Sequence, residues 1–166
     1  YLHDMKLCQE FAKINRRTIQ SIICYYMCWE VTKETERFQT IHNYIEYDTN
    51  IVRKGAISAK TGEKVLIPIN MRDGCILGIG KGNEDWNYSA PHGAGRTMSR
   101  SKAKESILLE EYQKAMDGIF TTSVNTSTID ESPMAYKTMD EIIGNIKDTV
   151  EIVDIIKPIY NFKANE

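Results

Sequence analysis

One short stretch of the sequence gathers an imidazole, a proline, two glycines and a cation. Residues 89–96 read Ser-Ala-Pro-His-Gly-Ala-Gly-Arg. Pro91 fixes its own φ and biases Ala90 toward an extended backbone, while the glycines allow angles that other residues avoid. The pattern predicts a tight turn that holds His92 outward beside exposed amides. A neutral imidazole is a competent nucleophile near pH 7.

Cations follow this turn within a few residues. Arg96 and Arg100 carry guanidinium groups, which suit phosphate oxygens. A helix is expected over residues 99–117, ended by Gly118, and its positive end would then lie near His92 and favour an anion. We interpret the stretch as a histidine nucleophile beside a phosphate-binding turn. An ordinary tight turn with a structural histidine is the alternative, because short Gly-rich loops are often false positives.

The remaining patterns predict the elements that must position these side chains. Three- and four-residue spacing predicts a helix over residues 4–28, and β-forming residues place His42 and Asn43 at a strand or its end. Further strands are expected at 51–57, 65–69 and 75–79, followed by a long glycine-rich loop over 78–95. Thr138 is expected to cap a helix that runs toward Pro158, before a final strand at 159–162.

These elements indicate an α+β fold, with a mixed or antiparallel sheet and flanking helices. The sequence shows no internal repeat and no second domain, so residues 1–166 are expected to form a single region.

The composition of the chain excludes some classes of function. The chain has 166 residues and a formal net charge of −2, so any RNA contact must come from a local basic patch. No apolar run approaches the ~20 residues of a membrane span. The four cysteines show no zinc spacing, and we interpret them as buried free thiols of a reducing cytoplasm.

Several motifs, in this order along the chain, resemble those of the RtcB family of RNA ligases. The Ser89–Arg96 stretch is the most specific of them. The others are Ile41–Tyr44, Ile67–Gly74, Gly80–Asn83, Asp130–Lys137 and the segment from Lys157-Pro158 to Lys163. The resemblance covers essentially the whole chain, and it corresponds to the C-terminal part of a larger RtcB-like fold.

The resemblance implies a GTP- and manganese-dependent RNA ligase with His92 as the guanylylated residue. Attack of His92 on the α-phosphorus of GTP would expel pyrophosphate. The GMP would then pass to an RNA 3′-phosphate, formed where needed from a 2′,3′-cyclic phosphate, and a 5′-hydroxyl would displace it. Such chemistry serves tRNA splicing or RNA repair. RNA and GTP are the expected partners, and an activator protein is a further one that the resemblance admits.

Other roles also follow from the resemblance, residue by residue. It implies His42 as a metal ligand, and Asn43, Arg96 and Arg100 as contacts to RNA or phosphate. The implied nucleotide-binding residues are Asn70, Cys75, Gly93, Ala94, Gly95, Tyr136 and Lys163. Many family members have serine where this chain has Cys75, and Arg72 and Asp73 also depart from the family pattern.

Two other functions stay open at this level. The family's other metal ligands lie in an N-terminal half that is expected to be absent from this chain. The chain could therefore be a binding module that holds a nucleotide or phosphate without chemistry. A metal-dependent phosphoesterase is the second rival, in which His92 would only bind metal.

Overall fold

The computed structural model describes residues 1–163. Its helices are α1 (Leu2–Tyr26), α2 (Arg100–Ser106), α3 (Leu109–Ala115) and α4 (Met139–Asn145), joined by 3-10 turns η1 (Glu84–Trp86), η2 (Thr126–Glu131) and η3 (Pro133–Ala135). Its strands are β1 (Tyr44–Ile45), β2 (Val52–Arg53), β3 (Ala56–Ser58), β4 (Lys64–Asn70), β5 (Gly74–Gly80), β6 (Ser89–Pro91) and β7 (Val150–Ile156). The helices and small sheets confirm the α+β class.

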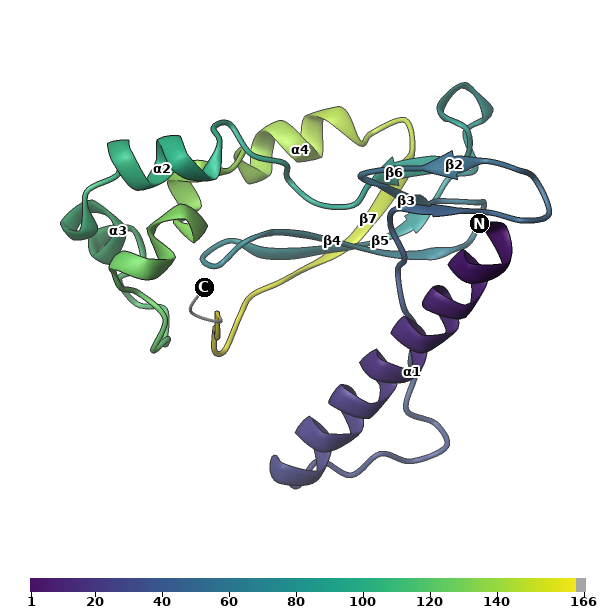
Figure 1. Ribbon diagram of the computed structural model, residues 1–166, viewed down its shortest axis with the longest axis horizontal. Helices are drawn as coiled ribbons and strands as arrows, with labels where there is room; N and C mark the ends of the chain where they lie inside the picture. Colours follow the sequence, from purple (N-terminus) through teal and green to yellow (C-terminus); the bar gives the residue numbers. More distant parts are fainter. Residues whose placement is uncertain (164–166) are drawn as a thin grey trace.

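The largest sheet is antiparallel, with β5 between β4 and β7. Alternate residues of β4, Val65, Ile67 and Ile69, are buried on one face. Helix α4 lies along this face and adds Ile142 and Ile146 to the same core (Figure 1). Two short antiparallel ribbons, β1–β2 and β3–β6, flank the sheet, and Ile57 and Ala90 connect the second ribbon to its core.

A second apolar cluster joins α2 and α3 to the 3-10 turns. Tyr112 is fully buried there, and its hydroxyl lies 3.1 Å from the sulfur of Met71, the first residue after β4. The cluster therefore anchors the end of the main sheet. The other members are Ala103, Ile107, Met116, Ile129 and Ala135.

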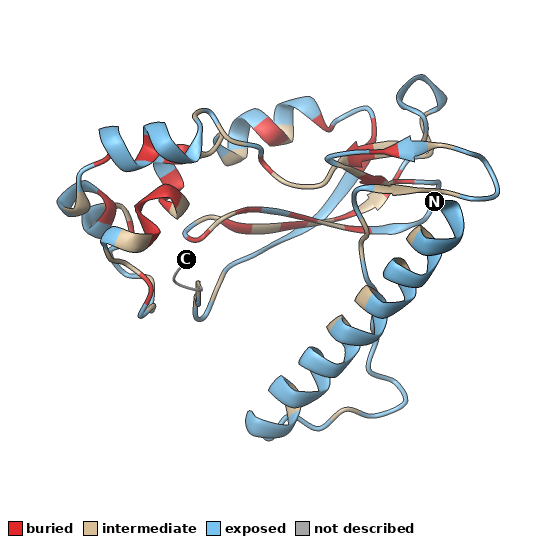
Figure 2. Ribbon diagram, in the orientation of Figure 1, coloured by how far each residue is buried: buried red, intermediate tan, exposed pale blue. Residues whose placement is uncertain are grey.

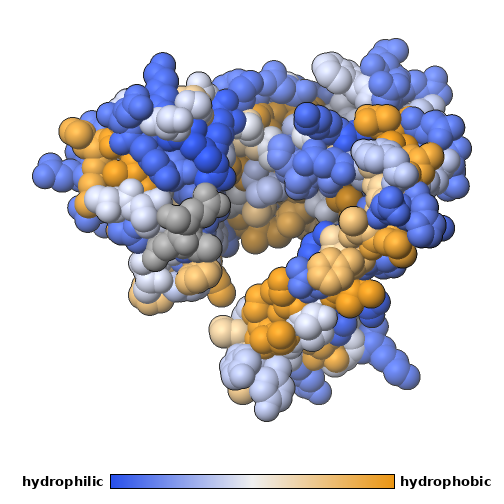
Figure 3. All heavy atoms as spheres, viewed as in Figure 1, coloured by the Kyte–Doolittle hydropathy of each residue, from blue (hydrophilic) through white to orange (hydrophobic). Residues whose placement is uncertain are grey.

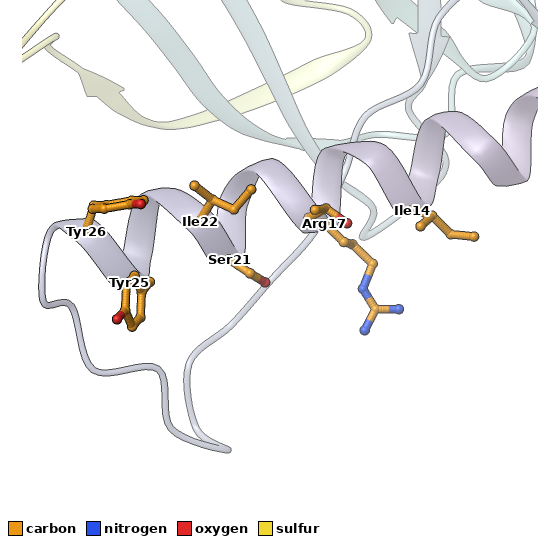
Figure 4. Close-up of a pocket in the computed structure, with 7 residues that line it drawn as sticks. Ile14, Arg17, Ser21, Ile22, Tyr25 and Tyr26 are labelled. Carbon is orange, nitrogen blue, oxygen red and sulfur yellow. The ribbon is translucent and has the colours of Figure 1, made fainter.

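Helix α1 projects away from these two cores (Figure 1). None of its 25 residues, all of which the structure describes, is buried (Figure 2). Its apolar side chains gather on the surface as a continuous patch (Figure 3). On one side of the helix, Ile14, Arg17 and Tyr25 line a shallow hollow together with Ser21 and Ile22 (Figure 4). The predicted helix is confirmed, yet it is not packed within residues 1–163.

The strand expected over 51–57 is divided in two. β2 pairs with β1, whereas β3 pairs with β6. Gly55 lies between them with φ of +67°, a left-handed angle that interrupts a strand and favours glycine. The loop expected over 78–95 correspondingly contains β6, whose pairing partner is distant in sequence.

Two predicted helices end early. The helix expected over 99–117 breaks at Ile107 and Leu108, which are extended so that Ile107 enters the second cluster. The Thr138 cap is confirmed, because its side chain accepts a hydrogen bond from the Glu141 amide. That helix stops at Asn145, however, and the β-branched run after it forms β7 on the edge of β5.

Two smaller predictions are wrong. The segment 159–162 forms no regular strand, and only a single bridge joins Asn161 to Thr121. All four cysteines are free thiols within the described residues, but none is buried: Cys24 and Cys75 are half-buried, and Cys8 on α1 and Cys28 just after it are exposed.

Candidate active site

His92 follows β6 directly, and its ring is held by a distant backbone carbonyl. The Gly55 oxygen lies 2.8 Å from His92 Nδ1 and also accepts from the His92 amide at 3.2 Å. A carbonyl can only accept, so Nδ1 carries the proton of the neutral imidazole. Nε2 therefore keeps its lone pair. The residue is half-buried, and it lines a cavity.

His42 lies against the same ring. The two imidazole centroids are 4.7 Å apart with the planes tilted by 46°. Next to it, Asn43 takes a left-handed φ of +60°, and its side-chain oxygen accepts from the Gly55 amide at 2.8 Å. In this structure Asn43 thus fixes the residue whose carbonyl holds His92. Its expected contact to RNA or phosphate stays a prediction.

A cavity of about 720 Å³ opens beside His92, a size typical of nucleotide sites. It lies at the end of the main sheet, where β4 turns into β5. The structure brings all seven predicted nucleotide-binding residues to its wall, along with Arg96. They are Asn70, Cys75, Gly93, Ala94, Gly95, Tyr136 and Lys163.

The turn after His92 is packed tightly against β4. The Ala94 amide donates to the Pro68 carbonyl at 3.1 Å, so this amide is occupied by the fold. A side chain at Gly93 would lie 3.0 Å from the same carbonyl. Gly95 has a φ of +72°. The glycines therefore allow the backbone to line the cavity, whereas the expected phosphate contact through the Ala94 amide would require that bond to break.

Glu131 lines the same cavity as His92 and holds several of its other side chains. Its carboxylate accepts from the Tyr136 hydroxyl and from Arg96, both at 2.9 Å, and lies 3.1 Å from Lys163 Nζ. The Arg96 guanidinium also stacks over the Tyr136 ring at 4.7 Å. One half-buried carboxylate thus holds three of the predicted ligand-binding side chains in place.

The charges of this wall are strongly coupled. Burial, together with the Glu131 carboxylate, raises the pKa of Tyr136 to about 12, so the hydroxyl stays a donor. Burial would also raise the pKa of Glu131, yet Lys163 and its other donors outweigh that effect, and its pKa lies below the ordinary value. Glu131 is therefore an acceptor at neutral pH.

Arg96 keeps one unused donor in this wall. Its Nη2 is bound to Glu131 and Tyr136, but Nη1 is buried and has no hydrogen-bond partner among the described residues. A buried unpaired donor is costly, and a ligand that accepts from it recovers the cost.

Asn70 and Cys75 line the cavity in different ways. The Asn70 side chain closes its own turn, accepting from the amides of Arg72 and Asp73. Arg72 and Asp73, which depart from the family pattern, form a local ion pair at 2.9 Å. Burial raises the pKa of the Cys75 thiol, which thus stays protonated as a weak donor.

Arg100 lies outside this cavity. It pairs with Asp130 at 2.7 Å and with Glu131 at 3.1 Å, and it lines a smaller cavity of about 220 Å³ that shares Glu131 and Lys163 with the first. No residue of α2 is among those that line the larger cavity within residues 1–163. The expected placement of a helix end at the nucleotide site is therefore wrong.

The described residues do not make a complete metal site. Within residues 1–163, no group of three or more histidine, cysteine, aspartate or glutamate side chains could hold an ion. The imidazole of His42 is a suitable donor for manganese, but one ligand does not hold it. In the same part of the chain no helix is both long and apolar enough to cross a membrane.

Three residues of the site were missed from sequence. Glu131 stood inside the Asp130–Lys137 motif without a role, and Gly55 gave no signal, since its contribution is a carbonyl. Arg53 is 2% exposed and forms an ion pair with Glu46 at 3.0 Å. An arginine inside a short β-forming run was the one available hint, because such a residue is buried only when its charge is paired.

Comparison with known proteins places the chain in a family. A family model described as tRNA-splicing ligase RtcB matches residues 1–164. The RNA-splicing ligase RtcB of Escherichia coli K12 is 32% identical over 178 residues, which cover 99% of this chain and 43% of that relative. The tRNA-splicing ligase RtcB of Aeropyrum pernix is 41% identical over 86 residues, or 49% of this chain and 18% of that relative. The chain spans less than half the length of these relatives, and it belongs to the RtcB family.

Proposed function

We propose that this chain carries the guanylylation centre of a GTP-dependent RNA ligase. The ligase would join RNA 3′-phosphate or 2′,3′-cyclic phosphate ends to 5′-hydroxyl ends, in tRNA splicing or RNA repair. One observation carries the proposal: His92 presents a free Nε2 at a cavity that is lined by every residue expected to bind the nucleotide.

The geometry around His92 suits a nucleophile. In the step we propose, Nε2 forms a bond to the α-phosphorus of GTP while the bond from that phosphorus to the bridging oxygen breaks, and pyrophosphate leaves. The ring becomes positively charged as it attacks. The Gly55 carbonyl, which accepts from Nδ1–H, stabilises that charge and holds the ring in one tautomer.

The wall that contains Glu131 would bind the nucleotide. Arg96, whose buried Nη1 has no partner among the described residues, and the ammonium of Lys163 would donate to phosphate or ribose oxygens there. The Tyr136 hydroxyl and the Glu131 carboxylate supply a donor and an acceptor for polar edges of the ligand. In the second stage, the guanylate would pass from His92 to the RNA 3′-phosphate, and the 5′-hydroxyl would then displace GMP.

The family resemblance also implies manganese. The described residues gather too few donors for it, so we assign it no step, and we propose His42 as the ligand that this chain contributes. RNA and GTP are the proposed partners, and an activator protein is a further candidate partner. The proposed location is the cytoplasm.

A binding module is the second candidate. The shortage of metal donors within residues 1–163 favours it, because a chain that cannot hold the ion could still bind GTP without reacting. The two candidates share the same cavity and differ in whether a bond to His92 forms.

The deciding experiment incubates the chain with α-labelled GTP and manganese chloride. An acid-labile label on the peptide that contains His92 is the expected result. Binding of GTP without label would favour the binding module. Release of phosphate without label would instead favour the phosphoesterase.

A further inference from the structure

The two histidines of the site come from segments that are far apart in sequence. His42 lies two residues before β1, and His92 lies directly after β6. Their rings are nevertheless held 4.7 Å apart, although β1 and β6 belong to different ribbons. Some contact between the ribbons must therefore set their spacing.

Arg53 makes that contact. Its side chain is almost completely buried between the two ribbons, and all three of its nitrogens donate. Nη1 donates to Glu46 at 3.0 Å and to the Tyr44 hydroxyl at 3.2 Å, on the His42 side. Nε donates to the Ser89 hydroxyl at 2.9 Å, on the His92 side.

Further bonds extend this link along the second segment. Arg53 Nη2 donates to the carbonyls of Asn87 at 3.3 Å and Tyr88 at 3.4 Å, just before β6. The backbone of Arg53 pairs with Tyr44 in the β1–β2 ribbon. Two residues later, Gly55 accepts from His92 and donates to Asn43. A single arginine is thus connected to both histidine-bearing segments.

We infer that Arg53 is a positioning residue for the His42–His92 pair. This role rests on the proposed function for its catalytic meaning, but the spacing of the rings can be measured without activity. Only a planar guanidinium, with donors fixed in several directions, can reach both segments at once. A lysine carries its three donors on a single atom and cannot do so.

The test compares Arg53→Lys with the unchanged chain by NMR. The chain has three histidines, so the ring signals can be assigned, and His3 near the chain start serves as reference. We expect the nuclear Overhauser contact between the rings of His42 and His92 to be lost in R53K. The rate of His92 labelling at saturating GTP should fall by roughly 10- to 100-fold, while the GTP concentration at half-maximal rate changes less than about threefold.

Two further variants provide a control and a second test of this proposal. Met116→Ala weakens the second apolar cluster without touching Arg53, and it should keep both the ring contact and the rate. Ser89→Ala removes the Nε bond to β6, together with the bond from the Ser89 hydroxyl to the Asn87 carbonyl in the same segment. It should weaken the ring contact and lower the rate about threefold. If R53K does not fold, the S89A variant tests the positioning role of Arg53 in its place.

The proposal and the proposed function can fail separately. The positioning role would be overturned if R53K folds and keeps both the ring contact and the unchanged rate. If R53K does not fold, the same result for a folded S89A would overturn it. A chain that shows the ring contact, loses it in R53K and never takes label would overturn the guanylylation chemistry while supporting Arg53 as the link.

Discussion

Helix α1 and the β4–β5 hairpin are both rich in apolar residues, and they are used in opposite ways. The hairpin buries Val65, Ile67 and Ile76 almost completely against α4 and β3. The helix leaves Ile22 and Ile23 about half exposed, at 50% and 49%. Two hydrogen bonds, from Arg16 to Gln39 and from Tyr47 to the Leu2 carbonyl, link α1 to the segment that follows it.

This difference between the helix and the hairpin shows that local conformation and burial have different causes. A helix forms where residues recur at three- and four-residue spacing, whatever lies beside it. Burial requires a partner surface. The hairpin has one, whereas no residue of α1 is buried within residues 1–163. The site of the molecule is built on the packed region, because a cavity needs walls that hold their positions.

The largest expected effect is on the guanylate labelling of His92, which lies in the packed region and not on α1. His92→Ala should lower guanylate labelling by about 10³-fold or more, because no other group in the cavity wall is proposed to attack the phosphorus. The loss of one hydrogen bond to Gly55 should lower the unfolding midpoint by no more than about 4 °C. Label counting and thermal unfolding measure these two quantities.

A matched control lies on α1. Arg17→Ala removes an exposed cation of the unpacked helix and should leave the labelling rate unchanged. Labelling that survives in H92A would refute the nucleophile, and labelling that depends on Arg17 would mean that α1 takes part in the site.

The next effect tests the packed core. Ile67→Ala removes a fully buried side chain of β4 and should lower the free energy of unfolding by about 2–5 kcal/mol. Urea denaturation followed by circular dichroism would measure the change. A loss below about 1 kcal/mol would show that the hairpin is as loosely packed as α1.

A smaller effect concerns the charged wall of the cavity. The pKa of Glu131 is lowered in the folded chain, so its stabilising contribution is present above its ordinary pKa of 4.5 and is lost as the pH falls through the lowered value. Glu131→Gln should cost about 1–3 kcal/mol at pH 7 and make stability less dependent on pH below 4.5. Denaturation midpoints of both proteins between pH 3 and pH 7 (roughly the range of carboxylate titration) would measure this.

Two outcomes would count against that wall. Equal pH profiles for the two proteins would mean that Glu131 is not held by Lys163 and Arg96 in solution. A profile in which stability rises as the pH falls would reverse the sign of the coupling.

The smallest effect is expected on α1. Ile22→Ala should change the free energy of unfolding by less than about 0.5 kcal/mol, because the side chain is half exposed and its helix has no buried residue. The same urea titration as for Ile67 provides the measurement. A cost comparable to that of I67A would show that α1 is packed in solution, and the contrast between the two regions would disappear.

Sequence patterns predicted the parts of the fold that depend on neighbours along the chain. The strand at 65–69 and the Thr138 cap are confirmed, since both depend on residues only a few positions apart. Predictions failed where a distant partner decided the outcome. β7 became a strand because β5 offered an edge, and Ile107 left its helix to enter a core.

The candidate site divides in the same way. Its motif residues could be named from the sequence, and those predicted to bind the nucleotide line one cavity in the structure. Their roles in binding stay a prediction. The roles of Glu131, Gly55 and Arg53 could not be named from the sequence, because each depends on at least one partner that is 35 or more residues away. No local pattern reports a carbonyl that accepts from an imidazole 37 positions later.

By itself the sequence determined the order of helices and strands near each motif, and the chemical groups available for a site. Only the tertiary structure decided which nitrogen of His92 is free and which side chains face it across the cavity. The physical reason is that spacing along a chain sets the conformation of a few residues at a time. The distance between His42, His92 and Glu131 depends instead on strand pairing and on buried hydrogen bonds between segments that the chain order keeps apart.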